Sequence, residues 1–166
     1  MATLADVLDE MTVEGELYEK LPDGAVRCFA CAHRCLIREG RRGICQVRFN
    51  RRGVLRVPWG YVAGLQADPI EKKPFFHVLT GSDALTFGML GCDFHCANCQ
   101  NWLSSQALRD PDSDVSIGFL RRITPEQVVA AAKRSGAKVI ASSYNEPLIT
   151  SEWAVGIFRL AQREGL

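Results

Sequence analysis

Three cysteines on one short loop constrain this chain more than any other feature. Cys92, Cys96 and Cys99 come directly after the apolar residues 84–90, which have the length and character of a buried strand. Such a loop can present three thiolates to one metal centre, and thiolates are soft ligands that suit iron–sulfur clusters. A [4Fe–4S] cluster that only carries electrons has four cysteine ligands, so a set of three leaves one iron open for a substrate.

The second half of the sequence alternates strands with helices. Residues 138–142 have the same strand character as residues 84–90, and a helix should separate them. Thr124 can cap that helix, because Pro125 suits its first turn and a glutamine lies three residues after the cap. Gly136 should end it. This order predicts two parallel strands joined by a helical crossover.

A second motif follows the second strand. The segment Tyr-Asn-Glu-Pro at residues 144–147 lies just after that strand, as the cysteine loop lies just after the first. The carboxyl ends of parallel strands share one edge of a sheet, so we expect the two motifs to meet there. The other interpretation is a simple turn from strand to helix, because Asn and Pro favour turns. A helix after Thr150 should bury a stripe at spacings of three and four, made of Trp153, Ile157, Leu160 and Ala161.

Four other cysteines lie in the first part of the chain. We expect residues 1–80 to form a small cysteine-rich module and residues 81–166 to form strand–helix units of an α/β domain. Short strands are expected in residues 17–27 and 54–65, and a short helix in residues 2–10. The four thiolates can close a zinc site or hold a second [4Fe–4S] cluster in an electron relay, and either would stabilise a thin core. They are Cys28, Cys31, Cys35 and Cys45.

Charge and hydropathy exclude several classes of protein. The 166 residues carry a formal net charge of +1, which gives no reason for strong nonspecific binding to nucleic acid or to an acidic membrane. No apolar stretch approaches the length of a membrane span, and residues 1–11 are acidic and do not form a secretory signal. We therefore expect a cytoplasmic protein, in which seven cysteines indicate metal binding more than disulfide formation.

These motifs together resemble the radical SAM superfamily. The cysteine loop at residues 92–99, the Asp-Pro-Ile-Glu-Lys-Lys-Pro run at residues 68–74 and the segment at residues 144–147 are similar to the radical SAM member of the AmmeMemoRadiSam group. That group in turn resembles pyruvate formate-lyase-activating enzymes. The resemblance covers most of the chain, from about Cys28 to the end. It implies an α/β fold, the N-terminal portion of a partial (β/α)6 barrel, and we expect a chain without the distal wall of that barrel to be poorly stable or inactive alone.

The resemblance also implies cofactors and their ligands. A [4Fe–4S] cluster would be held by Cys92, Cys96 and Cys99, and the open iron would bind S-adenosylmethionine (SAM). Glu146 would accept a charge-assisted hydrogen bond from the SAM ammonium group, with support from Asn145. An external donor such as flavodoxin or ferredoxin would supply the electron that yields a 5′-deoxyadenosyl radical. That radical would take hydrogen from a glycine of a partner protein, from another protein side chain or from a small molecule.

Several residues depart from the family or keep two interpretations. Asn98 stands where many family members have an aromatic residue near the adenine. His95 is interpreted as a loop residue and not as a further ligand. Five polar residues between positions 68 and 77 have two interpretations: they border the substrate pocket or they form a solvated loop. These residues are Asp68, Glu71, Lys72, Lys73 and His77.

Two other functional classes compete with this interpretation. A zinc-stapled binding module fits less well, because the second cysteine group has only three members and follows a strand. An iron–sulfur electron carrier of the bacterial ferredoxin type would need a four-cysteine run that ends in Cys-Pro, which the sequence lacks. A zinc protein is colourless and a cluster protein is brown, so colour distinguishes these classes.

Overall fold

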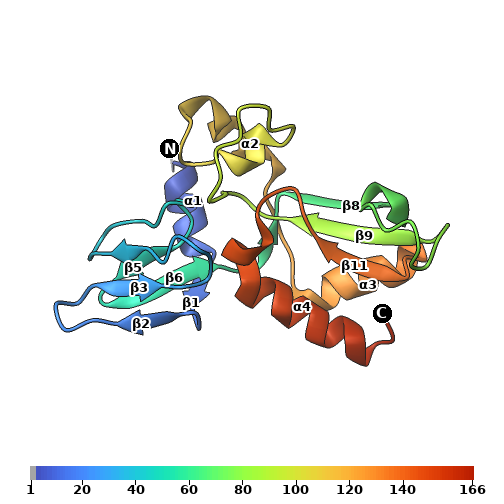
Figure 1. The fold of residues 1–166 in the computed structure, drawn as a ribbon, viewed down its shortest axis with the longest axis horizontal. Coiled ribbons are helices and arrows are strands. Elements are labelled where there is room, and N and C mark those ends of the chain that lie inside the picture. The colour runs from blue at the N-terminus through green and yellow to red at the C-terminus, as the bar shows by residue number, and fades with distance from the viewer. Residues whose placement is uncertain (1–2) are drawn as a thin grey trace.

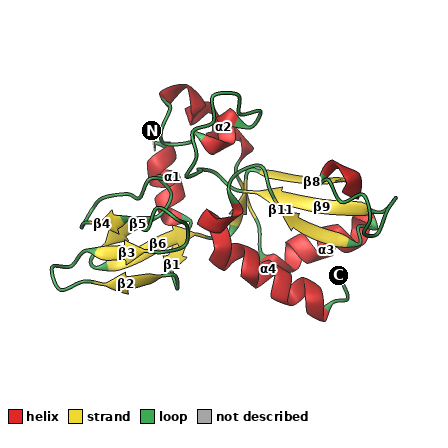
Figure 2. Cartoon of the chain, in the orientation of Figure 1, coloured by secondary structure: helices red, strands yellow, loops and turns green. Residues whose placement is uncertain are grey.

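The computed structural model describes residues 3–166 and has a mixed α/β architecture with four small sheets (Figure 1). Strands of the N-terminal part gather at one side, and a three-stranded sheet with two helices lies at the other (Figure 2). The described residues form no closed barrel, and the partial barrel stays a prediction. No helix among them is long and apolar enough to cross a membrane.

The N-terminal part has one helix and two antiparallel sheets. Helix α1 (Leu4–Glu10) begins with a capping box: Thr3 Oγ1 accepts the Asp6 amide at 3.2 Å, and Asp6 Oδ2 accepts the Thr3 amide at 2.9 Å. The predicted helix is thus confirmed from Leu4 onward, and residue 2 lies outside the described residues. The sheets have the orders β1-β6-β5 and β2-β3-β4, with β1 (Thr12–Glu14), β2 (Tyr18–Lys20), β3 (Val26–Cys28), β4 (Leu36–Ile37), β5 (Phe49–Arg51) and β6 (Val54–Pro58).

Turns break both of the strands predicted in this part. Within residues 17–27, β2 and β3 form an antiparallel pair around Gly24, whose φ of 75° favours glycine. Within residues 54–65, β6 ends before Gly60, which also has a φ of 75°. The apolar residues continue on both sides of each turn, which is why the sequence predicts longer strands. After Gly60 the chain forms β7 (Tyr61–Val62) and β8 (Gly64–Pro69).

The largest sheet contains the predicted parallel pair. Strands β9 (Asp83–Gly88) and β11 (Val139–Ser142) pair in parallel, with Ala84 opposite Val139. Strand β8 pairs antiparallel with β9 on its other side. The sheet order is therefore β11-β9-β8, and it includes residues 64–69, which the sequence analysis placed in the first module.

Helix α3 (Pro125–Ser135) connects the two parallel strands and has the predicted boundaries. Thr124 Oγ1 accepts the Gln127 amide at 3.3 Å, and Gln127 Oε1 accepts the Thr124 amide at 2.9 Å. Gly136 ends the helix in the left-handed region, at a φ of 74°. Both capping signals in the sequence are therefore confirmed.

Helix α4 (Ser151–Arg163) packs beside α3 on one face of the sheet (Figure 1). Trp153, Ile157 and Ala161 of the predicted stripe are buried, and Leu160 packs at its edge. Thr150 precedes the helix as predicted, but its hydroxyl donates to the Pro147 carbonyl at 3.2 Å and does not cap the helix.

Short elements occupy the connections. The stretch from the cysteine loop to residue 122 contains α2 (Trp102–Ser105), the 3-10 helix η2 (Pro111–Phe119) and β10 (Arg121–Arg122), which pairs with β7. Two further 3-10 turns, η1 (Ile70–Lys72) and η3 (Pro147–Thr150), follow β8 and the second motif.

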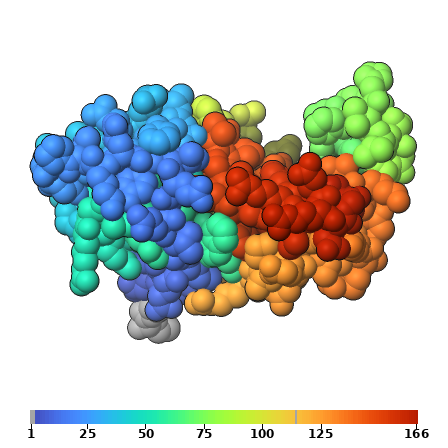
Figure 3. Space-filling model, turned by 90° about the horizontal axis from the view of Figure 1, so that it is seen from below, coloured from blue at the N-terminus to red at the C-terminus, as the bar shows by residue number. Residues whose placement is uncertain are grey.

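Both parts of the chain share one apolar core. Leu4, Leu8 and Val47 belong to the same buried cluster as Met89 and Leu90, which lead into the cysteine loop. A smaller cluster beneath the N-terminal sheets is built from Val26, Cys28, Ile37, Leu55 and Val57. In the space-filling view the N-terminal residues pack directly against the C-terminal ones (Figure 3). The N-terminal part therefore does not depend on its own thin core alone.

Truncation of Ile157 should destabilise the whole chain. Its side chain is fully buried between α4 and the sheet, so Ile157→Ala should lower the free energy of unfolding in urea by about 2–5 kcal/mol. Val155 lies on the same helix and is 41% exposed, and Val155→Ala should change that free energy by at most about 0.5 kcal/mol. Equal effects of the two substitutions would contradict the packing of α4.

Candidate functional site

A hydrogen bond joins the two motifs at the carboxyl ends of β9 and β11. Asn145 Nδ2 donates to the carbonyl oxygen of Gly91 at 3.0 Å, and Asn145 is buried. Gly91 immediately precedes the cysteine loop, and Asn145 belongs to the Tyr-Asn-Glu-Pro segment. The predicted meeting of the two motifs at one end of the sheet is thus confirmed.

The start of the cysteine loop is fixed tightly against the N-terminal part. A Cβ atom on Gly91 would lie 2.8 Å from the Cys45 carbonyl oxygen, and the φ of Gly91 is 86°. Arg109 donates to the carbonyls of Cys92 and Phe94 at 2.9 Å each, and also to that of Ile44 at 2.5 Å. The sequence gives no signal for this role, because Arg109 lies in a stretch without periodicity.

The three loop cysteines differ in exposure. Cys92 is buried, Cys99 is half-buried with Sγ 3.3 Å from Ser105 Oγ, and Cys96 is exposed. Within residues 3–166, no group of three or more His, Cys, Asp or Glu side chains is arranged to hold a metal ion. The donor set itself fits a cluster with one open iron, because it consists of three soft thiols on a loop held by its backbone.

Asn145 and Glu146 offer oxygen acceptors beside this loop. Asn145 Oδ1 is buried and accepts no hydrogen bond from the described residues, which is unusual for a buried polar atom. Glu146 stands at the N-cap of η3, where its Oε1 accepts the Leu148 amide at 3.3 Å. The second motif thus carries two acceptors on adjacent residues, the Asn145 amide oxygen and the Glu146 carboxylate.

A cavity of about 250 Å³ opens at the same end of the sheet. Residues 100–101, which directly follow the cysteine loop, line this cavity together with the side chain of Tyr144. The Tyr144 ring packs over two glycines: a Cβ on Gly88 would lie 2.7 Å from the Tyr144 Cδ2 atom, and one on Gly64 3.3 Å from Cε2. The thiols and Glu146 do not line this cavity. The structure thus joins the two motifs through Asn145, and it gives Tyr144, for which the sequence predicts no role, a place over Gly64 and Gly88 in the cavity wall.

The Asp-Pro-Ile-Glu-Lys-Lys-Pro run organises one loop and reaches Tyr144. Asp68 accepts hydrogen bonds from Lys72 Nζ at 2.7 Å and pairs with Lys73 Nζ at 3.6 Å, and the bond from Lys72 lowers the pKa of Asp68. Lys73 Nζ lies 5.5 Å from the centroid of the Tyr144 ring. Glu71 accepts the amide of Gly81 at 2.7 Å and closes the loop.

His77 lies apart from these groups, on the exposed part of that loop. The segment around it projects from the rest of the molecule (Figure 3). The set of five residues with two interpretations is therefore divided by the structure, with only Lys73 in contact with a motif residue. Large apolar side chains are exposed beside His77, namely Phe75, Phe76, Val78 and Leu79.

The four N-terminal cysteines lie near the start of the cysteine loop. All are free thiols; Cys28 and Cys45 are buried, and Cys31 and Cys35 are half-buried. Burial raises the pKa of Cys45. Burial raises the pKa of Cys31 to about 11, and the carboxylate of Asp93 adds to the increase. Asp93 belongs to the cysteine loop, so Cys31 adjoins the first motif, although the four N-terminal thiols are not arranged as a metal site.

The chain is similar in sequence to a curated protein. It is 39% identical over 154 residues to "Uncharacterized protein MJ0808" of Methanocaldococcus jannaschii, and the match covers 92% of this chain and 44% of that protein. The chain thus spans less than half the length of the curated relative that it matches. No protein-family model matches the sequence, and no solved structure matches it.

Alkylation should report the protonation of Cys31. Its pKa is raised from 9.0 to about 11, so the neutral thiol contributes stability below about pH 9 that is lost as the pH rises through about 11. In the metal-free folded chain, the rate of iodoacetamide reaction at Cys31 should therefore reach half its maximum near pH 11. The urea-unfolded chain is the control and should show the midpoint near pH 9. A midpoint near pH 9 in the folded chain would contradict the burial of this thiol.

Proposed function

We propose that the chain is the cluster- and SAM-binding part of a radical SAM enzyme. The observation that carries the proposal is the hydrogen bond from Asn145 to Gly91. It joins a three-thiol loop to an Asn-Glu-Pro turn at the carboxyl ends of two parallel strands, which is where α/β proteins build their sites. Three thiols without a fourth protein ligand fit a cluster that keeps one iron for a substrate.

Each motif residue has a distinct part in this proposal. Cys92, Cys96 and Cys99 would hold the [4Fe–4S] cluster, and Asn145 and Glu146 would bind the amino group of SAM. When bound, the reduced cluster supplies one electron that splits the SAM sulfonium into methionine and a 5′-deoxyadenosyl radical. The protein would orient SAM, and the cavity beside Tyr144, which residues 100–101 also line, is the space proposed for the substrate.

The substrate and the partners follow from the resemblance alone. We propose a glycine of a partner protein, another protein side chain or a small molecule as the hydrogen donor, and flavodoxin or ferredoxin as the source of the electron. A reducing compartment, the cytoplasm, suits seven free thiols. For Cys28, Cys31, Cys35 and Cys45, zinc and a second [4Fe–4S] cluster both remain proposals.

The first experiment is anaerobic reconstitution followed by iron and sulfide analysis and EPR. The reduced chain should show a [4Fe–4S] signal that changes when SAM is added, because SAM occupies the open iron. Cys96→Ala should abolish the SAM-sensitive signal, whereas Cys35→Ala should retain it, since Cys35 lies outside the loop. Bound zinc without iron, or a cluster signal indifferent to SAM in a folded chain, would refute the proposed function.

Removal of the Glu146 charge should weaken SAM binding. A hydrogen bond to a charged group is stronger than a neutral one by about 1 kcal/mol, so Glu146→Gln should raise the SAM dissociation constant by about five- to tenfold. Glu126→Gln on the exposed side of α3 is the matched control and should leave the constant unchanged. Equilibrium dialysis of the reconstituted chain measures both, and an unaffected Glu146→Gln variant would remove Glu146 from the SAM site.

A further inference from the structure

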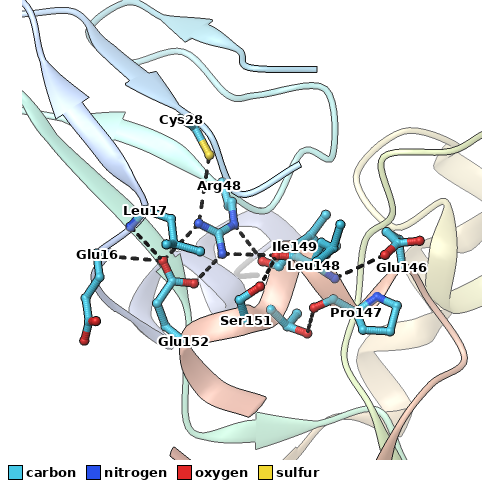
Figure 4. A network of polar contacts seen from close by, with 11 residues as sticks. Glu16, Leu17, Cys28, Arg48, Glu146, Pro147, Leu148, Ile149, Ser151 and Glu152 are labelled. Atoms are coloured by element: carbon cyan, nitrogen blue, oxygen red, sulfur yellow. Dashed lines mark hydrogen bonds and ion pairs between the residues drawn. The ribbon is translucent and has the colours of Figure 1, made fainter. Parts of the chain in front are cut away.

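A buried ion pair lies between the N-terminal part and the start of α4 (Figure 4). The side chains of Arg48 and Glu152 are 2% and 6% exposed. Glu152 Oε1 also accepts the amides of Glu16 at 3.2 Å and of Leu17 at 3.4 Å. Burying two charges is costly unless their remaining hydrogen-bonding groups are also satisfied. The hydrogen-bond partners of Arg48 therefore determine whether the cost of burying this ion pair is offset.

Arg48 uses all five of its N–H groups. Nε donates to the Ile149 carbonyl at 2.7 Å, and Nη2 donates to the Leu148 carbonyl at 3.5 Å and to Glu152 Oε2. Nη1 donates to Glu152 Oε1 at 3.1 Å and approaches Cys28 Sγ at 3.9 Å. Five donors in a fixed plane are the full capacity of an arginine, and a lysine offers only three.

These bonds hold the turn that carries Glu146. Both backbone polar groups of Leu148 are hydrogen-bonded: its amide donates to Glu146 Oε1 at 3.3 Å, and its carbonyl accepts from Arg48 (Figure 4). The next carbonyl, that of Ile149, is held by the shorter bond to Arg48 Nε. Both carbonyls belong to η3, which begins directly after Glu146. A guanidinium from the N-terminal part thus fixes the backbone on which the candidate SAM carboxylate stands.

We propose that Arg48 is a positioning residue that sets the affinity for SAM by fixing the turn of Glu146. The inference rests on the proposed function, because it takes Glu146 as a SAM ligand. Arg48 itself does not meet SAM, and acts through η3. The N-terminal part of the chain therefore contributes to SAM recognition through a residue that lies nearly a hundred positions before the motif.

Arg48→Lys is the informative substitution. It keeps the positive charge beside Glu152, but its three donors cannot replace the four bonds that Arg48 makes to the two Glu152 oxygens and the two carbonyls. Arg42→Lys is the matched control: Arg42 also joins distant segments, through Asp9 Oδ1 at 2.7 Å and the Gln46 carbonyl at 3.1 Å, and it does not contact η3. Both variants remove one guanidinium from an ion pair, but the Arg42 side chain is 23% exposed and that of Arg48 is 2% exposed, so the free energy of unfolding of each variant is measured beside the other readouts.

Hydrogen exchange in the metal-free chain tests the effect on the turn. Amides of residues 148–152 should exchange about tenfold faster in Arg48→Lys than in the unsubstituted chain or in Arg42→Lys. This readout needs neither cluster nor SAM. Equal exchange at these amides in all three chains would overturn the inference, and this outcome would leave the proposed function untouched.

A double-mutant cycle tests the route through Glu146. In the reconstituted chain, Arg48→Lys should raise the SAM dissociation constant by about tenfold, with iron content and circular dichroism unchanged. In the Glu146→Gln background the same substitution should add less than about twofold, because the positioned carboxylate is already gone. Full additivity would show a merely structural role and would overturn the inference.

Two further outcomes are also decisive. If Arg48→Lys does not fold, the double variant Arg48→Met/Glu152→Gln replaces it in both experiments, because it removes the two carbonyl bonds of Arg48 without leaving a buried charge unpaired; unchanged exchange and SAM affinity would then overturn the inference. If the unsubstituted reconstituted chain binds no SAM, the proposed function fails. The role of Arg48 in SAM binding fails with it, even where the exchange data confirm that Arg48 fixes the turn.

Discussion

The parallel pairing of β9 with β11 is the constraint on which the rest of the arrangement depends. Two parallel strands deliver the segments that follow them to the same edge, whatever those segments contain. The four paired positions, from Ala84 with Val139 to Phe87 with Ser142, leave the cysteine loop and the Asn-Glu-Pro turn close enough for one hydrogen bond. Helix α3 makes this register possible, because it returns the chain across one face of the sheet.

On the other face of the same sheet, two glycines leave room for an aromatic ring. Gly64 lies opposite Gly88, and the Tyr144 ring fills the space above them. Any larger residue at Gly88 would collide with Tyr144 and with the Ser143 backbone, so the position of the second motif depends on a glycine at residue 88. Lys73 approaches that ring from the loop after β8, which gives the Asp-Pro-Ile-Glu-Lys-Lys-Pro run a physical place in the site.

The sequence predicts best where local chemistry decides the structure. Thr124, Gln127 and Gly136 define the boundaries of α3 by capping alone, and the apolar stripe of α4 follows from helical spacing. Sequence patterns fail where partners are distant along the chain. The strands expected in residues 17–27 and 54–65 are instead divided by local turns at Gly24 and Gly60, and the first of these has the turn sequence Pro22-Asp23-Gly24. The roles of Arg109 and Arg48 cannot be predicted from the sequence, because their acceptors are mostly backbone carbonyls far away in the chain.

The guanidinium of Arg48 has no spare donor, and this has a consequence for the thiol beside it. One edge of its plane meets Cys28, a candidate ligand of the N-terminal metal site, and the other edges meet Glu152 and η3. A thiol that gives up its proton to a metal becomes a stronger acceptor, and a rigid five-donor plane can follow it only by shifting against its other partners. The same guanidinium therefore touches a thiol of the first part of the chain and the backbone that carries Glu146 in the second.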